Sequence, residues 1–257
     1  MRSGRWPLAA AMVLLLLTIP LAGDSLMGGL RGVGYTVCHQ IPGHSLFIDG
    51  QQLPLCARCT GIYLGFLVGL LGLALLGKLG ASKMPPRPVA SLLLLVLLAM
   101  AVDGFNSLLG FFPDAPQLYQ PSNSLRLATG MGAGTALALL LVPLMNDALW
   151  AKPEPWESVS DLQELAGYAV LAALATVLVG SEHPALLYPI AVSSVVGVFA
   201  ALSMAGTTLA ATLARREKVA SSLPEAGGLL LAGFALASVA MLTLGEARTY
   251  LPPLLGL

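Results

Sequence analysis

Long runs of apolar residues, interrupted by short polar segments, dominate the pattern along the chain. A bilayer core about 30 Å thick is crossed by roughly 20 apolar residues in an α-helix. Because an unpaired backbone cannot face lipid, each run of that length predicts a transmembrane helix, and together they predict an all-α helix bundle. Seven runs meet this condition, over residues 7–23, 61–80, 88–110, 124–146, 163–181, 185–211 and 224–245. We therefore expect one transmembrane domain, residues 1–257, with about seven helices.

The distribution of basic residues predicts how this bundle is oriented. Cytoplasmic segments of membrane proteins are enriched in Lys and Arg. With the N-terminus in the cytoplasm, the cytoplasmic segments contain nine basic residues: Arg2, Arg5, Lys78, Lys83, Arg87, Lys152, Arg215, Arg216 and Lys218. The opposite side contains four: Arg31, Arg58, Arg126 and Arg248. The bias predicts a multi-pass protein of the cell (cytoplasmic) membrane, the inner membrane of a bacterium, with its N-terminus inside.

The first apolar run has a second interpretation. Arg2 and Arg5 precede it, as basic residues precede the apolar core of a signal peptide, and cleavage would then fall near Ala22-Gly23. The run is long for a signal peptide, so we favour an uncleaved helix. Either interpretation leaves the orientation unchanged.

Composition agrees with a membrane protein and excludes some partners. Hydrophobic residues make up 56% of the chain and charged residues 10%, whereas soluble domains have about 25% charged residues. The formal net charge is zero, so no basic field indicates nucleic acid. The sequence has no phosphate-binding glycine loop, serine-nucleophile motif or His-Glu-x-x-His motif, so hydrolase and ATP-driven functions have no support. Whether the protein is an enzyme stays open.

All three cysteines and two of the three histidines fall in or beside one predicted loop. The longest segment outside the predicted helices runs over residues 24–54, on the extracytoplasmic side. It contains Cys38, His39 and His44, and it leads into the Cys-Ala-Arg-Cys sequence at residues 56–59. This concentration marks the segment as the candidate for chemistry.

Local geometry predicts that these cysteines meet. Asp49-Gly50, flanked by apolar residues, is a strong hairpin signal, and a hairpin would fold Cys38 back toward Cys56 and Cys59. Pro54 suits the first turn of a helix, where Cys56 and Cys59 would share one face. The helix N-terminus and the neighbouring Arg58 both favour thiolate over thiol.

Three interpretations of this cluster remain open. In the first, Cys38, Cys56 and Cys59 bind zinc together with His39 or His44, as a tetrahedral Cys3His site. In the second, Cys56 and Cys59 are a redox-active pair and Cys38 a resolving thiol. In the third, two cysteines form a structural disulfide and leave one thiol.

Polar residues inside the third and fourth predicted helices lie near the same end of the bundle. Asp103 and Asn106 share one helix face, and Asn123 and Arg126 share another. Ionisable groups in membrane segments have partners, so we expect Asp103 to pair with Arg126. Either this pair is purely structural, or these residues and Arg58 form a polar cavity that binds an anionic group.

Glycines recur every four residues on two of the predicted helices, at positions 61, 65 and 69 and at positions 130 and 134. Such small-residue stripes allow helix backbones to approach closely. We expect the second, third and fourth predicted helices to form a tight core, and residues 160–250 to serve as scaffold.

Four blocks of the sequence together resemble a known family. They are Cys38-His39-Gln40-Ile41-Pro42, Pro54-Leu55-Cys56-Ala57-Arg58-Cys59-Thr60-Gly61-Ile62-Tyr63, Asp103-Gly104, and Asn123-x-x-Arg126-x-x-Thr129-Gly130. The chain is similar over residues 35–135 to an uncharacterised family of predicted bacterial and archaeal membrane proteins, domain of unknown function 2085. The family has an arginine where this chain has His44, so the resemblance favours His39 as the fourth ligand. It implies no activity.

We therefore expect a zinc-binding membrane protein whose extracytoplasmic site, formed by Cys38, His39, Cys56 and Cys59, adjoins a polar pocket for a small anionic or lipid-headgroup ligand. The first alternative is a thiol-disulfide oxidoreductase that uses Cys56 and Cys59 and passes electrons to quinone. The second is a transporter or a structural membrane subunit.

Overall fold

The computed structural model describes residues 25–112 and 115–254, and this part of the chain is mostly α-helical. Six of its helices are long and apolar enough to cross a membrane. They are α3 (Ala57–Leu75), α4 (Arg87–Leu109), α5 (Asn123–Leu149), α6 (Leu162–Gly180), α7 (Leu187–Leu213) and α8 (Leu223–Leu254). The all-α fold and six of the predicted runs are thus confirmed, and the run at 7–23 lies outside the described residues.

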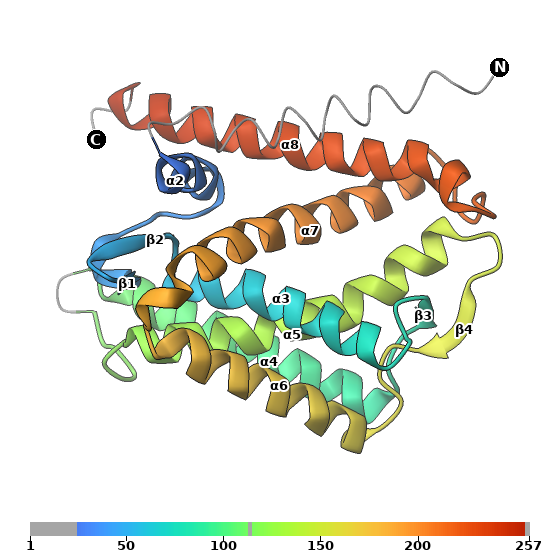
Figure 1. The fold of residues 1–257 in the computed structure, drawn as a ribbon, viewed down its shortest axis with the longest axis horizontal. Helices are drawn as coiled ribbons and strands as arrows, with labels where there is room; N and C mark the ends of the chain where they lie inside the picture. The colour runs from blue at the N-terminus through green and yellow to red at the C-terminus, as the bar shows by residue number, and fades with distance from the viewer. Residues whose placement is uncertain (1–24, 113–114, 255–257) are drawn as a thin grey trace.

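The helices α3 and α5 occupy the middle of the bundle (Figure 1). Helix α6 packs against both of them and α4 against α5, while α7 covers their other side and carries α8 on its outer face. The buried residues of α3 and α5 thus form the central layer, and most of α4, α6 and α8 faces outward.

Glycines determine how closely α3 and α5 approach. A Cβ atom at Gly65 would overlap the backbone carbonyl of Met131, and one at Gly134 would overlap the carbonyl of Ile62. The predicted close packing is therefore confirmed for this pair of helices. Helix α4 approaches α5 at Gly132, where a Cβ atom would come within 3.0 Å of the Val96 side chain, whereas one at Gly104 would meet open space.

The predicted hairpin is present between β1 (Ser45–Ile48) and β2 (Gln51–Cys56), which pair antiparallel. Asp49 and Gly50 have φ angles of 51° and 71°, and positive φ at both positions gives the turn a twist that suits a hairpin. Pro54, expected in a helix, instead lies in β2. Helix α3 begins three residues later, with Cys56 as its N-cap.

Residues 24–54, predicted to lie outside the helices, contain a short α-helix. Helix α2 (Leu26–Val37) begins after Ser25, whose hydroxyl caps Gly28 N–H, and buries Met27, Leu30 and Val33 on one face. With 12 residues it is too short to cross a bilayer. Figure 1 shows α2 end-on, whereas the six long helices run across the view. It therefore lies across one end of the bundle, where it contacts β2, α7 and α8.

The opposite end of the bundle has a short parallel strand pair that was also not predicted. Strand β3 (Ala81–Lys83) pairs with β4 (Glu154–Glu157). The Asn146 side chain donates hydrogen bonds of 2.8 Å to the carbonyls of Leu79 and Ala81. These bonds fix the connection between α3 and α4 to the end of α5.

Candidate metal centre and its polar surroundings

The three cysteines come together at the α2 end of the bundle. Cys38 follows the last turn of α2, Cys56 ends β2, and Cys59 lies in the first turn of α3. Their sulfur atoms all lie within 4.8 Å of one another, and all three are free thiols. Cys38 and Cys56 are buried, whereas Cys59 is half-buried. The hairpin produces this arrangement: β1 leads away from Cys38, and the antiparallel β2 brings the chain back to Cys56 beside it.

Backbone N–H groups point at two of the sulfur atoms. Cys56 N donates to Cys38 Sγ at 3.1 Å, and Cys59 N donates to Cys56 Sγ at 3.5 Å. Both donors belong to the start of α3, where backbone N–H groups have no partner within the helix. Such donors stabilise negative charge on sulfur.

The cluster distributes its protons unevenly. Hydrogen bonds from the Cys56 and Cys59 thiols hold the pKa of Cys38 well below its ordinary value. The same interaction with Cys38 raises the pKa of Cys56, because its proton is held between the two sulfur atoms. The backbone N–H of Cys56, which donates to Cys38 Sγ, likewise favours a thiolate at Cys38.

The sulfur positions suit a tetrahedral metal ion. With zinc–sulfur bonds of about 2.3 Å, sulfur atoms in a tetrahedral site are about 3.8 Å apart. Three sulfur atoms within 4.8 Å of one another need only small side-chain adjustments to reach that separation. Three thiolates would leave one of the four positions for another ligand.

His39 and His44 lie beside the cluster but outside the group of three. His39 Nδ1 accepts a hydrogen bond from Ile41 N at 3.1 Å, so its ring proton lies on Nε2. Its ring stands edge-on to His44, with centroids 5.4 Å apart. Burial lowers the pKa of both imidazoles and keeps them neutral. The third histidine, His183, caps the short turn before α7.

The buried ion pair of this region differs from the predicted one. Asp103, 1% exposed, pairs with Arg58 of α3 and not with Arg126 of α5. Arg58 also donates to Ser107 Oγ at 2.9 Å, and Tyr119 Oη donates to the Asp103 carboxylate at 2.9 Å. The guanidinium of Arg58 is therefore engaged with α4, although the residue lies between two cysteines in sequence.

Arg126 is buried without an acidic partner in the described part of the chain. Its side chain is 5% exposed, and Nη1 donates to Asn123 Oδ1 at 2.8 Å. Its Nε atom is buried and has no hydrogen-bond partner among these residues. Asn123 in turn donates to the carbonyls of Gly43 and Ser45, which fixes the start of α5 to the hairpin.

The remaining predicted residue, Asn106, supports a loop. Its amide donates to the carbonyl of Tyr119 and accepts from Leu118 N at 2.7 Å. Asn106 thereby holds the segment that brings Tyr119 to Asp103. Of the five predicted ligand-binding residues, only Arg126 retains a buried donor without a partner in the described ranges.

Two side chains that position Cys38 were not identified from the sequence. Gln40 donates to the carbonyls of Arg31 and Pro54, which connects α2 with β2. Arg248 of α8 donates to the carbonyls of Tyr35 and Cys38, and its guanidinium lies 4.4 Å from the centre of the Tyr35 ring. The position of Gln40 in the Cys-His-Gln block was a usable signal, whereas nothing in the sequence connects Arg248 with Cys38.

The six apolar helices and the apolar surface of the bundle define a multi-pass helical membrane protein with a three-cysteine cluster at one end. The profile of a family described as "Predicted membrane protein (DUF2085)" matches residues 38–140. The chain belongs to this family. The matched segment contains every cysteine and all five predicted ligand-binding residues.

Two archaeal relatives are similar to part of the chain. An uncharacterised protein of Methanocaldococcus jannaschii is 36% identical over 123 residues, 48% of this chain and 72% of the relative. An uncharacterised protein of Methanothermobacter thermautotrophicus is 36% identical over 107 residues, 40% of this chain and 83% of the relative. No solved structure matches the chain.

Proposed function

We propose that this protein binds one zinc ion through the thiolates of Cys38, Cys56 and Cys59. The observation that carries the proposal is the convergence of three free thiols, within 4.8 Å, from three different elements. A disulfide would use two of them and leave the third unpaired, whereas a metal ion uses all three. A bound ion would also fix the end of α2 to the start of α3, as structural zinc sites do.

The fourth ligand in this proposal is His39 or a small external ligand. Binding zinc through Nε2 requires the His39 proton to move to Nδ1, and the hydrogen bond from Ile41 N would then be lost. A water molecule or small anion in the fourth position needs no such change. Zinc sites with three protein ligands keep that position open for water or substrate.

Metal analysis and thiol counting on one sample test this proposal. Protein purified in detergent should contain about one zinc ion per chain, and its thiols should react with an aromatic disulfide reagent only after a chelator removes the metal. The rival is the thiol-disulfide oxidoreductase, because Cys56 at the N-cap and Cys59 three residues later have the arrangement of a redox pair. Metal-free protein in which a quinone oxidises these two thiols to a disulfide, with formation of the quinol, and in which an added dithiol reduces the disulfide again, would replace the zinc proposal.

Arg126 supports the second element of the proposal, a binding site for a small anion or a lipid headgroup next to the metal. A buried guanidinium is stabilised by an acceptor with negative charge, and in the described residues Arg126 has only the neutral Asn123 amide. With inorganic phosphate as the probe, Arg126→Gln should weaken binding about tenfold or more. The exposed Arg216→Gln is the control, and equal phosphate affinity of both variants would remove the anion site.

The proposed orientation places the metal centre on the extracytoplasmic side of the cell membrane. The four arginines at this end, Arg31, Arg58, Arg126 and Arg248, all donate hydrogen bonds within the protein. The connections α3–α4, α5–α6 and α7–α8 lie at the end that carries β3 and β4 (Figure 1). Most of the Lys and Arg residues of the described chain fall in or beside these connections, as expected for a cytoplasmic end.

Single cysteines introduced at the two ends test the orientation. Gln120 and Lys152 are exposed, and they lie in connections at opposite ends of α5. An impermeant maleimide should label Gln120→Cys on intact cells, and Lys152→Cys only after permeabilisation. Labelling of the unsubstituted protein gives the background signal from its half-buried Cys59. The reverse labelling pattern would place the cysteine cluster in the cytoplasm.

A further inference from the structure

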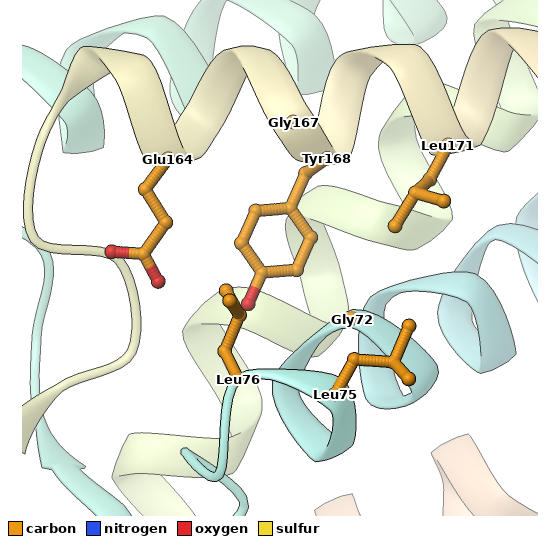
Figure 2. Close-up of a pocket in the computed structure, with 7 residues that line it drawn as sticks. All are labelled: Gly72, Leu75, Leu76, Glu164, Gly167, Tyr168 and Leu171. Atoms are coloured by element: carbon orange, nitrogen blue, oxygen red, sulfur yellow. The ribbon is translucent and has the colours of Figure 1, made fainter.

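We propose that a pocket at the opposite end of the bundle binds one diacyl phospholipid by its ester region. Figure 2 shows this pocket, a cavity of about 300 Å³ between the end of α3 and the first half of α6. Its walls are mostly apolar and are formed by Gly72, Leu75, Leu76, Gly167, Tyr168 and Leu171, with Glu164 as the one charged residue of the lining. Gly72 lies about 20 Å further along α3 than Cys59, so the pocket is independent of the metal centre.

The hydroxyl of Tyr168 indicates what the ligand must supply. Tyr168 is 2% exposed, and its hydroxyl has no hydrogen-bond partner in the described part of the chain. The ring packs against Gly72, where any Cβ atom would overlap it. Figure 2 shows the hydroxyl pointing from α6 toward Leu76 at the end of α3. The proton of a buried hydroxyl needs an acceptor. The carboxylate of Glu164, which also lines the pocket, is engaged by Lys78 and by Ser160 N–H, and the other walls offer only apolar side chains.

The surroundings of the pocket indicate that the acceptor belongs to a lipid. Both walls belong to helices that cross the membrane, and Leu75 at the edge is 70% exposed, so acyl chains surround the opening. Beyond the hydroxyl, Lys78 pairs with Glu164 at 2.6 Å and bonds to Ser160 at 2.8 Å. Along the pocket, apolar side chains are thus followed by the Tyr168 hydroxyl and then by charged groups.

A phospholipid has the same order along its length. Its acyl chains lead to ester carbonyls, which accept hydrogen bonds but donate none, and these lead to a charged headgroup. An ester carbonyl is therefore the complement of the Tyr168 hydroxyl, while the chain fills the apolar part of the cavity. Leu76, 53% exposed at the end of α3, has to turn aside for the carbonyl to reach the hydroxyl.

Native mass spectrometry of the full protein in detergent, titrated with palmitoyl-oleoyl-phosphatidylglycerol, tests the proposal. Tyr168→Phe should weaken binding of the first lipid by about two- to tenfold, the effect of one hydrogen bond. The diether analogue of the same lipid lacks the ester carbonyls, and the unsubstituted protein should bind it more weakly by the same factor. Combining Tyr168→Phe with the diether lipid should cause no further loss of affinity, because both changes remove the same hydrogen bond.

Two further variants test whether the lipid occupies this cavity and whether the loss of any tyrosine hydroxyl has the same effect. Leu171→Trp, which fills the cavity, should abolish binding of the first lipid with an unchanged circular dichroism spectrum. The exposed Tyr188→Phe should leave binding unchanged. Equal affinity of Tyr168→Phe and the unsubstituted protein, or of the ester and diether lipids, would overturn the proposal and assign the hydroxyl to water.

Discussion

Replacing Cys38, Cys56 or Cys59 singly with serine is expected to reduce bound zinc from about one ion per chain to less than about a tenth. A serine hydroxyl stays protonated at neutral pH and does not replace a thiolate as a ligand. Loss of one of three protein ligands also removes the connection between the end of α2 and the start of α3. Elemental analysis of each purified variant, normalised to protein content, gives the measurement.

The thermal midpoint provides a second readout of the same variants. A metal ion that binds only the folded protein raises its stability. The unsubstituted protein should therefore lose stability on chelation, whereas the three serine variants should not respond to the chelator. His183→Ala is the matched control, because His183 lies at the same end of the bundle outside the cluster. Full zinc content in Cys38→Ser would mean that Cys38 is no ligand, and would contradict the three-thiolate site.

Asp103→Asn is expected to destabilise the protein by about 3–5 kcal/mol, as found when one partner of a buried ion pair is removed. The change leaves the Arg58 guanidinium, whose side chain is 15% exposed, beside a neutral amide that is almost closed to solvent. It also weakens the hydrogen bond from Tyr119, which joins the connection before α5 to α4. Unfolding of the purified protein by denaturant gives the free-energy difference.

The pair Lys218–Asp147 offers the matched control for this variant. Both side chains are about half exposed, at 53% and 52%, and exposed pairs contribute about 0–1 kcal/mol. Asp147→Asn should therefore lower stability by less than about 1 kcal/mol. The double variant Arg58→Met/Asp103→Leu should recover most of the stability lost in Asp103→Asn, since it removes both buried charges. Equal stability of Asp103→Asn and Asp147→Asn would contradict a buried ion pair at Asp103.

The arrangement around the cysteines illustrates a limit of reading charges from sequence. Asp103 requires a cationic partner in a membrane helix, and the sequence offers both Arg58 and Arg126. Which arginine reaches the carboxylate depends on how α3, α4 and α5 rotate about their axes, and no local pattern records that rotation. The structure selects Arg58 and leaves Arg126 with Asn123. Only the three-dimensional structure therefore identifies Arg126 as the arginine with a buried N–H group that has no partner among the described residues.

Helix α2 shows a different limit. Its 12 residues are too few for a transmembrane run, and its glycines at 28, 29, 32 and 34 lower helix propensity. Its apolar face at Met27, Leu30 and Val33 is buried only because β2, α7 and α8 meet at this end. Tertiary packing supplied the stability that the local sequence lacks.

The sequence alone determined the features that arise from nearby residues and from the solvent. Apolar runs long enough for a bilayer specified six of the described helices, Asp49-Gly50 specified the hairpin, and the glycine stripes specified the contact between α3 and α5. Only the tertiary structure decided which arginine pairs with Asp103, and that Arg126 has no acidic partner among the described residues. It also decided the contact of Arg248 with the carbonyl of Cys38, 210 residues away in the chain. These features depend on helix rotation and on contacts between distant segments, which hydrophobic periodicity does not encode.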